Sequence, residues 1–234
     1  MYSWKVFMLS TIGIEAFWNT LMAVVFFFCW YYPIGLYRNA EATDDTTLRG
    51  FKMFLFIWIF FLFTSTFTNL VTAGLESVDT AGSITYMVFT LLLIFCGVLV
   101  RKDTMPGFWH FLYRVNPFTY LISGILSTGV ARAAISCAAN EYLAFSPPAN
   151  QTCGDFMQHY IARNGGYLLD PAATQACRFC RLDSTDVYLE GVNAPYAEAW
   201  RNFGLMWVYV GFNVIGALAL YWAVRVPKVK KAKA

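Results

Sequence analysis

Charged residues and histidine are scarce in this sequence. Lys, Arg, Asp and Glu together make up 13% of 234 residues, and the two histidines are His110 and His159. Neither histidine has neighbours spaced as metal ligands or as partners of a nucleophile, and the phosphate-binding pattern G-x-x-x-x-G-K-[ST] is absent. The chain is therefore predicted not to be an enzyme and to hold no cofactor or metal. Any energy coupling would require another polypeptide segment.

Apolar residues are abundant instead. They make up 58% of the sequence, and 19% of it is aromatic, which is typical of membrane proteins. Runs of about 20 apolar residues match the ~30 Å hydrocarbon core at 1.5 Å per helical residue. The sequence therefore predicts an all-α membrane protein with four transmembrane helices, at about residues 6–32, 51–73, 84–100 and 203–224.

A basic tail, residues 225–234, sets the expected orientation. It holds five of the seventeen Lys and Arg residues and no acid. Such a cluster beside a membrane helix marks the cytoplasmic side and contacts anionic lipid, and it is too short to indicate nucleic-acid binding. Four crossings then place both termini in the cytoplasm and the polar loop 131–201 on the extracellular or lumenal side. Asn150 in that loop begins the only N-glycosylation triplet, Asn-Gln-Thr.

Polar side chains within the first two expected helices form a candidate site. Glu15 and Asn19 are spaced i, i+4 and share a face. A carboxylate inside the bilayer is costly, so this face is expected to point into protein or a water-filled cavity. The alternative is that Glu15 lies near the interface and is solvated, because its depth depends on helix tilt. In the second helix, the hydroxyl-rich run 64–69 favours helix packing over substrate contact.

The stretch 85–130 begins as an apolar run and then breaks. Tyr86, Thr90 and Leu93 fall on one stripe of the expected helix 84–100. Charged residues interrupt the run at 101–103, and Pro and Gly divide residues 106–130 into short aromatic pieces. Irregular backbone at membrane depth must be covered by protein or line a cavity. Residues 106–130 are therefore expected to be re-entrant, dipping into the membrane without crossing it.

Four cysteines in the polar loop predict two disulfides, because the loop is expected to face an oxidising compartment. Their spacing is C-x15-C-x23-C-x2-C. A bond between the last two would close a very tight ring, so the nested pairing Cys137–Cys180 and Cys153–Cys177 is favoured over the crossed one. A zinc or redox role for the C-x-x-C pattern is the less favoured alternative.

The chain also contains the segments WNTLMAVVFFFCWYYPIGLYRNA, FTSTFT, FCGVL, MPGFWHFLYRVNPFTYLISGILSTG, PPANQTCGDFM and WRNFGLMWVYVGFN. Together these segments closely resemble fungal pleiotropic drug resistance transporters, the full-length G-subfamily ABC exporters. The resemblance covers nearly the whole chain. It corresponds to the C-terminal part of the second transmembrane domain, an ABC-2 type transporter domain.

The resemblance implies that the four helices are the third to sixth of a six-helix domain in a plasma-membrane exporter of amphipathic drugs, xenobiotics or lipids. In such exporters the second and fifth helices line the central cavity. Tyr86, Thr90 and Leu93 are thus expected to face the substrate path, and Val98 and Leu99 to form a hydrophobic gate. Segment 106–130 would lie beneath an extracellular cap.

The same resemblance implies partners outside this chain. ATP and Mg²⁺ would be bound by nucleotide-binding domains, and the first transmembrane domain would complete the pathway.

Two alternatives remain from the sequence. A tetraspanin-like membrane scaffold also has four helices and a large cysteine-containing loop between the third and fourth, although the Cys-Cys-Gly triplet of that family is missing here. Met1 falls where the transporter family has continuous sequence, so a non-functional truncated fragment is the other hypothesis.

Overall fold

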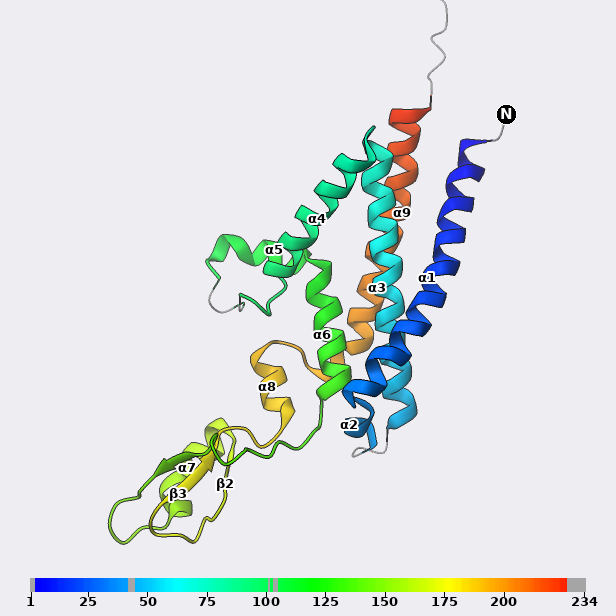
Figure 1. Cartoon of the computed structure of the whole chain (residues 1–234). Helices are drawn as coiled ribbons and strands as arrows, with labels where there is room; N and C mark the ends of the chain where they lie inside the picture. Colours follow the sequence, from blue (N-terminus) through cyan, green and yellow to red (C-terminus); the bar gives the residue numbers. More distant parts are fainter. Residues whose placement is uncertain (1–2, 42–44, 101, 103–104, 227–234) are drawn as a thin grey trace, which may run out of the picture.

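The computed structural model describes residues 3–41, 45–100, 102 and 105–226. Three of its segments are long and apolar enough to cross a bilayer: α1 (Trp4–Ile34), α3 (Thr46–Gly74), and the 3-10 turn η3 (Tyr196–Glu198) continued by α9 (Ala199–Arg225). Figure 1 shows α1, α3 and α9 running together, with the start of α1 and the end of α9 at one end of the molecule. The expected helices at 6–32, 51–73 and 203–224 lie within these segments.

The stretch between α3 and α9 holds two shorter apolar helices in place of the fourth crossing expected at 84–100. They are α4 (Val78–Ile94), which begins and ends earlier than the expected range 84–100, and α6 (Pro117–Val130). Between them lie η2 (Gly107–Trp109) and α5 (His110–Val115). Figure 1 shows α4 starting near the end of the molecule that carries the termini and α6 reaching the opposite end. The segment expected to be re-entrant therefore contains a regular helix of 14 residues, α6, beside α3.

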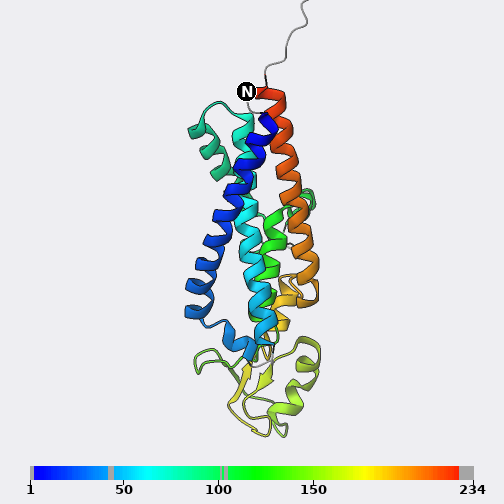
Figure 2. The same cartoon turned by 90° about the vertical axis from the view of Figure 1, so that its right-hand side faces the viewer.

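Helix α3 lies at the centre of the helical part (Figure 2). Its residues Phe56, Ile59 and Leu62 form a buried core with side chains of α6 and α9, among them Phe118 and Met206. Gly124 of α6 faces the ring of Phe56, and a Cβ at this glycine would lie 2.2 Å from ring carbons. The missing side chain therefore lets α6 approach α3 closely.

Several hydroxyl and amide groups form hydrogen bonds within this helical core. The Thr66 hydroxyl donates to the carbonyl oxygen of Leu62, one turn earlier in α3, at 2.8 Å, and it accepts from the Asn213 amide of α9 at 3.5 Å. Asn202 of α9 donates to the Ser123 hydroxyl of α6 at 3.1 Å. These contacts support the packing interpretation of the hydroxyl-rich run 64–69, because its threonines bond mainly to their own helix.

A small disulfide-bonded unit lies at the end of the molecule opposite the termini (Figure 1). It contains β1 (Leu143–Phe145), α7 (Cys153–Asn164), β2 (Tyr167–Leu168) and β3 (Cys177–Cys180), and the antiparallel sheet has the order β1-β3-β2. The bonds are Cys137–Cys180 and Cys153–Cys177, which is the nested pairing. The sheet was not part of the expected all-α fold, since its strands have only two to four residues.

Two short helices connect this unit and α1 to the rest, α8 (Thr185–Gly191) and α2 (Tyr37–Glu41). The Thr185 side chain of α8 donates to the carbonyl oxygen of Val130 at the end of α6, and the backbone amide of Arg132 donates to the Asp186 carboxylate at 2.8 Å. Of the basic tail 225–234, only Arg225 and Val226 lie within the described residues, and of the charged break 101–103 only Lys102.

Replacing both Cys153 and Cys177 with serine is expected to destabilise the disulfide-bonded unit by about 3 kcal/mol, because a bond closing a loop of this length lowers the entropy of the unfolded state and raises its free energy by that amount. The measurement is the rate of limited proteolysis within residues 131–201 of the full chain in neutral detergent. Cys29→Ser is the matched control, since Cys29 is an exposed free cysteine. Equal cleavage rates for the double variant and the unchanged chain would contradict the prediction.

Candidate functional site

One face of α4 is uncovered within the described residues. Tyr86 is 76% exposed and Leu93 45%, and Thr90, also exposed, lies between them on the same face. The opposite face packs against the core through Phe89 and Leu92. The stripe expected from the sequence is thus present, and it faces away from α3 and α6.

The two residues expected to form a gate follow the end of α4. Val98 is 51% exposed and Leu99 is 70% exposed, and both lie in non-helical backbone. Helix α4 ends at Ile94, and Gly97 has φ +95°, a left-handed conformation that keeps the helix from resuming. A Cβ at Gly97 would lie 2.6 Å from the Tyr113 ring, so glycine also allows Tyr113 to close over this turn.

The side chain of Asn116 bridges the end of α4 and the start of α6. Its side-chain amide donates to the carbonyl oxygen of Leu92 in the last turn of α4 at 2.6 Å. Its side-chain oxygen accepts from the backbone amide of Phe118 at 2.9 Å, so Asn116 is the N-cap of α6, and Pro117 is the first residue of that helix. Asn116 is 1% exposed. The cap could have been read from the Asn-Pro pair before an apolar run, whereas the bond to Leu92 has no sequence signal.

A polar contact joins α1 to α3 inside the apolar span. Glu15 Oε2 accepts hydrogen bonds from the Ser65 hydroxyl at 2.7 Å and from the Asn69 side-chain amide at 2.5 Å. Glu15 lies four residues before Asn19, the midpoint of the 31-residue α1, which is about 6 Å along the helix axis. With α1 centred in the bilayer, Glu15 lies within the hydrocarbon layer and faces protein. This geometry is consistent with a Glu15 face that points into protein or a cavity.

The second polar residue expected in α1, Asn19, lines the same pocket. The pocket has a volume of about 400 Å³, and its wall includes Glu15, Trp18 and the hydroxyls of Thr64 and Thr68. Among the described residues, the Asn19 side chain has no hydrogen-bond partner. Since Trp18 is 57% exposed, the pocket opens on the outer side of α1 and α3 and presents polar groups to whatever covers that side.

Two cations are buried at the opposite end of α3, near the disulfide-bonded unit. Arg49 is 2% exposed and Lys52 6%. Arg49 donates to the carbonyl oxygen of Ala131 at 2.7 Å, where the end of the α6 helix dipole favours a positive charge. Lys52 donates to the Tyr196 hydroxyl at 3.1 Å. No carboxylate pairs with either cation within the part of the chain that the structure describes.

The Tyr196 ring stabilises these buried cations through cation–π contacts. The Lys52 ammonium lies 4.5 Å from the ring centroid, and the guanidinium carbons of Arg49 and Arg132 lie 5.4 and 5.3 Å from it. Cation–π contacts of this kind contribute about 0.5–2 kcal/mol each. Sequence reasoning missed this cluster, because its members come from three distant segments and only Arg49 and Lys52 share a helical spacing.

Comparison with known proteins gives the chain a family. A family model described as ABC-2 type transporter matches residues 1–129, more than half of the 234 residues. The chain belongs to the ABC-2 type transporter family. This membership confirms the resemblance seen in the sequence segments and replaces the tetraspanin-like hypothesis.

Relatives of this ABC-2 transporter chain extend the similarity over nearly its whole length. ABC-type transporter vrcC of Aspergillus aculeatus is 55% identical over 230 residues, which are 98% of this chain and 16% of that protein. ABC multidrug transporter C of Aspergillus fumigatus is 54% identical over 232 residues, and ABC multidrug transporter atrG of Aspergillus oryzae 52% over 232 residues, in each case 99% of this chain and 16% of the relative. The chain thus spans about a sixth of the length of these relatives.

Replacing Asn116 with alanine is expected to lower the free energy of unfolding by about 1–2 kcal/mol, because the substitution removes an N-cap and leaves the buried carbonyl of Leu92 unpaired. Denaturation of the full chain in mixed micelles, followed by circular dichroism, measures the change. Asn140→Ala, at an exposed position, serves as the control. Identical unfolding midpoints for the two variants would count against the role assigned to Asn116.

Replacing Glu15 with alanine is expected to destabilise the pairing of α1 with α3 by about 1–2 kcal/mol, since two hydrogen-bond donors on α3 lose their acceptor. Glu15→Gln keeps an acceptor oxygen and should retain most of the stability. The same micelle unfolding experiment compares the two variants. The assignment fails if alanine and glutamine at this position have the same effect.

Proposed function

We propose that this chain forms part of the membrane pathway of an ATP-driven exporter of amphipathic drugs, xenobiotics or lipids. The observation that carries the proposal is the uncovered face of α4 with Tyr86, Thr90 and Leu93. A face that is apolar, aromatic and unpacked in this chain suits contact with a substrate or with a facing helix. Family membership and the printed names of the relatives, two of which are multidrug transporters, support the transport class.

The chemistry of this face suits loose recognition of amphipathic molecules. The Tyr86 ring offers a broad apolar surface with a hydroxyl at its edge. The Thr90 hydroxyl donates to the carbonyl oxygen of Tyr86 at 2.9 Å, so only its acceptor capacity remains for a ligand. Leu93 adds apolar area. Such a surface selects by shape and hydrophobicity, and alternating access would expose it to each side of the membrane in turn.

Val98 and Leu99 are placed to act as a hydrophobic gate in this proposal. They follow the end of α4 and expose their apolar side chains. Pressed against equivalent residues of a second transmembrane domain, they would exclude water until substrate passes. Gly97 supports this role because its left-handed backbone turns the two side chains out of the helix line.

ATP and Mg²⁺ would be held by nucleotide-binding domains outside this chain. Within the described ranges no group of three His, Cys, Asp or Glu residues could hold a metal ion. The partners in the proposal are these domains, the first transmembrane domain and the lipid bilayer. The whole transporter, in the plasma membrane, would couple ATP hydrolysis to movement of α4 and its surroundings.

In the proposed orientation both termini are cytoplasmic and the disulfide-bonded unit is extracellular. Two disulfides support an oxidising environment for that unit. Asn150 is exposed in a turn, with φ 70°, so its side chain is accessible for glycosylation.

Replacing Tyr86 or Thr90 with alanine in a complete transporter that contains this segment is expected to change resistance to individual compounds by about 3- to 10-fold, since one lost substrate contact contributes about 1 kcal/mol. Resistance of a host strain to a panel of chemically different compounds measures the effect. Ile215→Ala is the control, because Ile215 is 70% exposed on α9, away from this face. An unchanged resistance spectrum in both variants, with normal protein levels, would contradict the proposal.

A further inference from the structure

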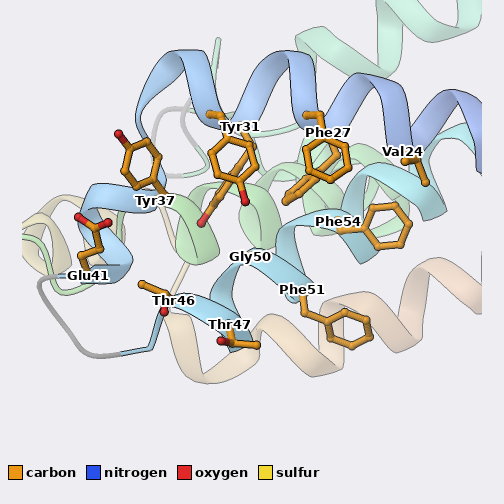
Figure 3. Close-up of a pocket in the computed structure, with 12 residues that line it drawn as sticks. Val24, Phe27, Tyr31, Tyr37, Glu41, Thr46, Thr47, Gly50, Phe51 and Phe54 are labelled. Atoms are coloured by element: carbon orange, nitrogen blue, oxygen red, sulfur yellow. The ribbon is translucent and has the colours of Figure 1, made fainter.

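A second and larger pocket lies where α1 ends and α3 begins. Its volume is about 640 Å³, within the range of small-molecule sites. Figure 3 shows Phe27 and Tyr31 projecting from α1 toward α3, with Tyr37 and Glu41 contributed by α2. Gly50 of α3 lies beneath the Tyr31 ring, and its missing side chain leaves room between the helices. This pocket is separate from the uncovered face of α4.

Five aromatic side chains, which we call the aromatic cage, form much of the pocket wall. They are Phe27, Phe28, Tyr31, Tyr32 and Tyr37. Their rings hold one another in place: Phe27 and Tyr31 stack with centroids 4.9 Å apart, Phe28 and Tyr32 stack at 5.9 Å, and Tyr32 and Tyr37 lie 5.8 Å apart. Tyr31 is 4% exposed and Tyr32 50% exposed. The cage therefore has a fixed inner wall and an open outer side.

One carboxylate accompanies these rings. Glu41 lines the pocket, is exposed, and forms no ion pair or hydrogen bond with any other described residue. The nearest cation on the same helix, Arg38, lies 6.0 Å from the Tyr37 ring centroid and is not part of the pocket wall. The pocket wall thus combines aromatic rings with a carboxylate that forms no ion pair among the described residues. This combination favours a cation.

The depth of the pocket matches the lipid headgroup layer. Helix α1 has 31 residues and α3 has 29, or roughly 44–46 Å at 1.5 Å per residue. The hydrocarbon core is ~30 Å thick, so about five residues at each helix end extend into the headgroup layer. Tyr31 and Tyr32 lie in the last turn of α1, and Gly50 is the fifth residue of α3.

We propose that this pocket binds the quaternary ammonium headgroup of phosphatidylcholine from the leaflet on the side of the disulfide-bonded unit. A trimethylammonium group has no N–H to donate and spreads its charge over methyl groups, which suits aromatic faces better than hydrogen-bond acceptors. Glu41 supplies the counter-charge, and the exposed rings of Phe28 and Phe51 lie where the acyl chains would continue. The site is independent of the proposed transport function, because binding requires neither α4 nor ATP.

The test compares lipids that differ in the headgroup methyls. The full chain in neutral maltoside detergent receives equal amounts of dioleoyl phosphatidylcholine and dioleoyl phosphatidylethanolamine, and native mass spectrometry counts the lipid that each molecule retains. We expect about threefold more phosphatidylcholine than phosphatidylethanolamine to be retained, or a larger excess. The reason is that the methylated ammonium gains binding free energy from cation–π contact with the aromatic rings. Equal retention of the two lipids would overturn the proposal.

Matched variants localise the preference to the pocket. Tyr32→Ala is expected to weaken phosphatidylcholine binding by about 3- to 30-fold, whereas Tyr32→Phe keeps the ring and should retain it. Glu41→Gln is expected to weaken binding by about 2- to 5-fold, and Glu76→Gln, at another exposed acid, should have no effect. A preference that survives both Tyr32→Ala and Glu41→Gln would place the lipid elsewhere and overturn the assignment.

A free cation provides the last arm of the experiment. Dodecyltrimethylammonium carries the same headgroup methyls without the phosphate, and it should displace phosphatidylcholine from the unchanged chain. If it binds in a Glu41-dependent manner but phosphatidylcholine does not compete with it, the pocket takes soluble cations and the lipid assignment is wrong. If Tyr32→Ala does not fold, the comparison of the two lipids on the unchanged chain still tests whether the chain prefers phosphatidylcholine.

Discussion

The side chain of Asn116 joins the end of α4 to the start of α6. A bilayer core offers no water, so every backbone group there needs a partner within the protein. A break after α4 leaves carbonyl groups in its last turn and amide groups in the first turn of α6 without partners along the helix. Asn116 serves both ends, donating to the carbonyl of Leu92 and accepting from the amide of Phe118. This one side chain therefore ties α4 to α6.

Helix α3 is also held by contacts within the protein, which position its neighbouring helices. It receives α6 and α9 on an apolar side, where Gly124 permits close approach. It receives α1 through Ser65 and Asn69, which donate to one carboxylate oxygen of Glu15. Between helices in lipid, apolar side chains gain little by leaving the lipid for each other, so close packing and hydrogen bonds determine which helices pair. The polar residues of α3 therefore fix its neighbours, and its many phenylalanines fill the space between them.

Sequence reasoning recovered the parts of this fold that depend on local pattern. Apolar runs located α1, α3 and α9, and cysteine spacing favoured the nested disulfides Cys137–Cys180 and Cys153–Cys177 that the structure contains. The i, i+4 spacing of Glu15 and Asn19 placed both residues beside one pocket. Sequence reasoning failed for features of the fold that depend on contacts between residues distant in sequence. The apolar run 84–100 gave no sign that the helix ends at Ile94, because that end depends on the backbone of Gly97 and on a bond from Asn116. The cations around Tyr196 were equally invisible, since Tyr196 is distant in sequence from Lys52.

Tyr196, just before the start of α9, holds η3 against the start of α3. Its hydroxyl accepts from Lys52, and its ring faces Arg49 and Arg132. Removing the partners of a buried cation leaves its charge buried and uncompensated, which costs several kcal/mol. Separation of η3 from α3 is therefore strongly disfavoured. Any rearrangement of α3 must carry the start of α9 with it, and through α9 the end of the loop that holds both disulfides.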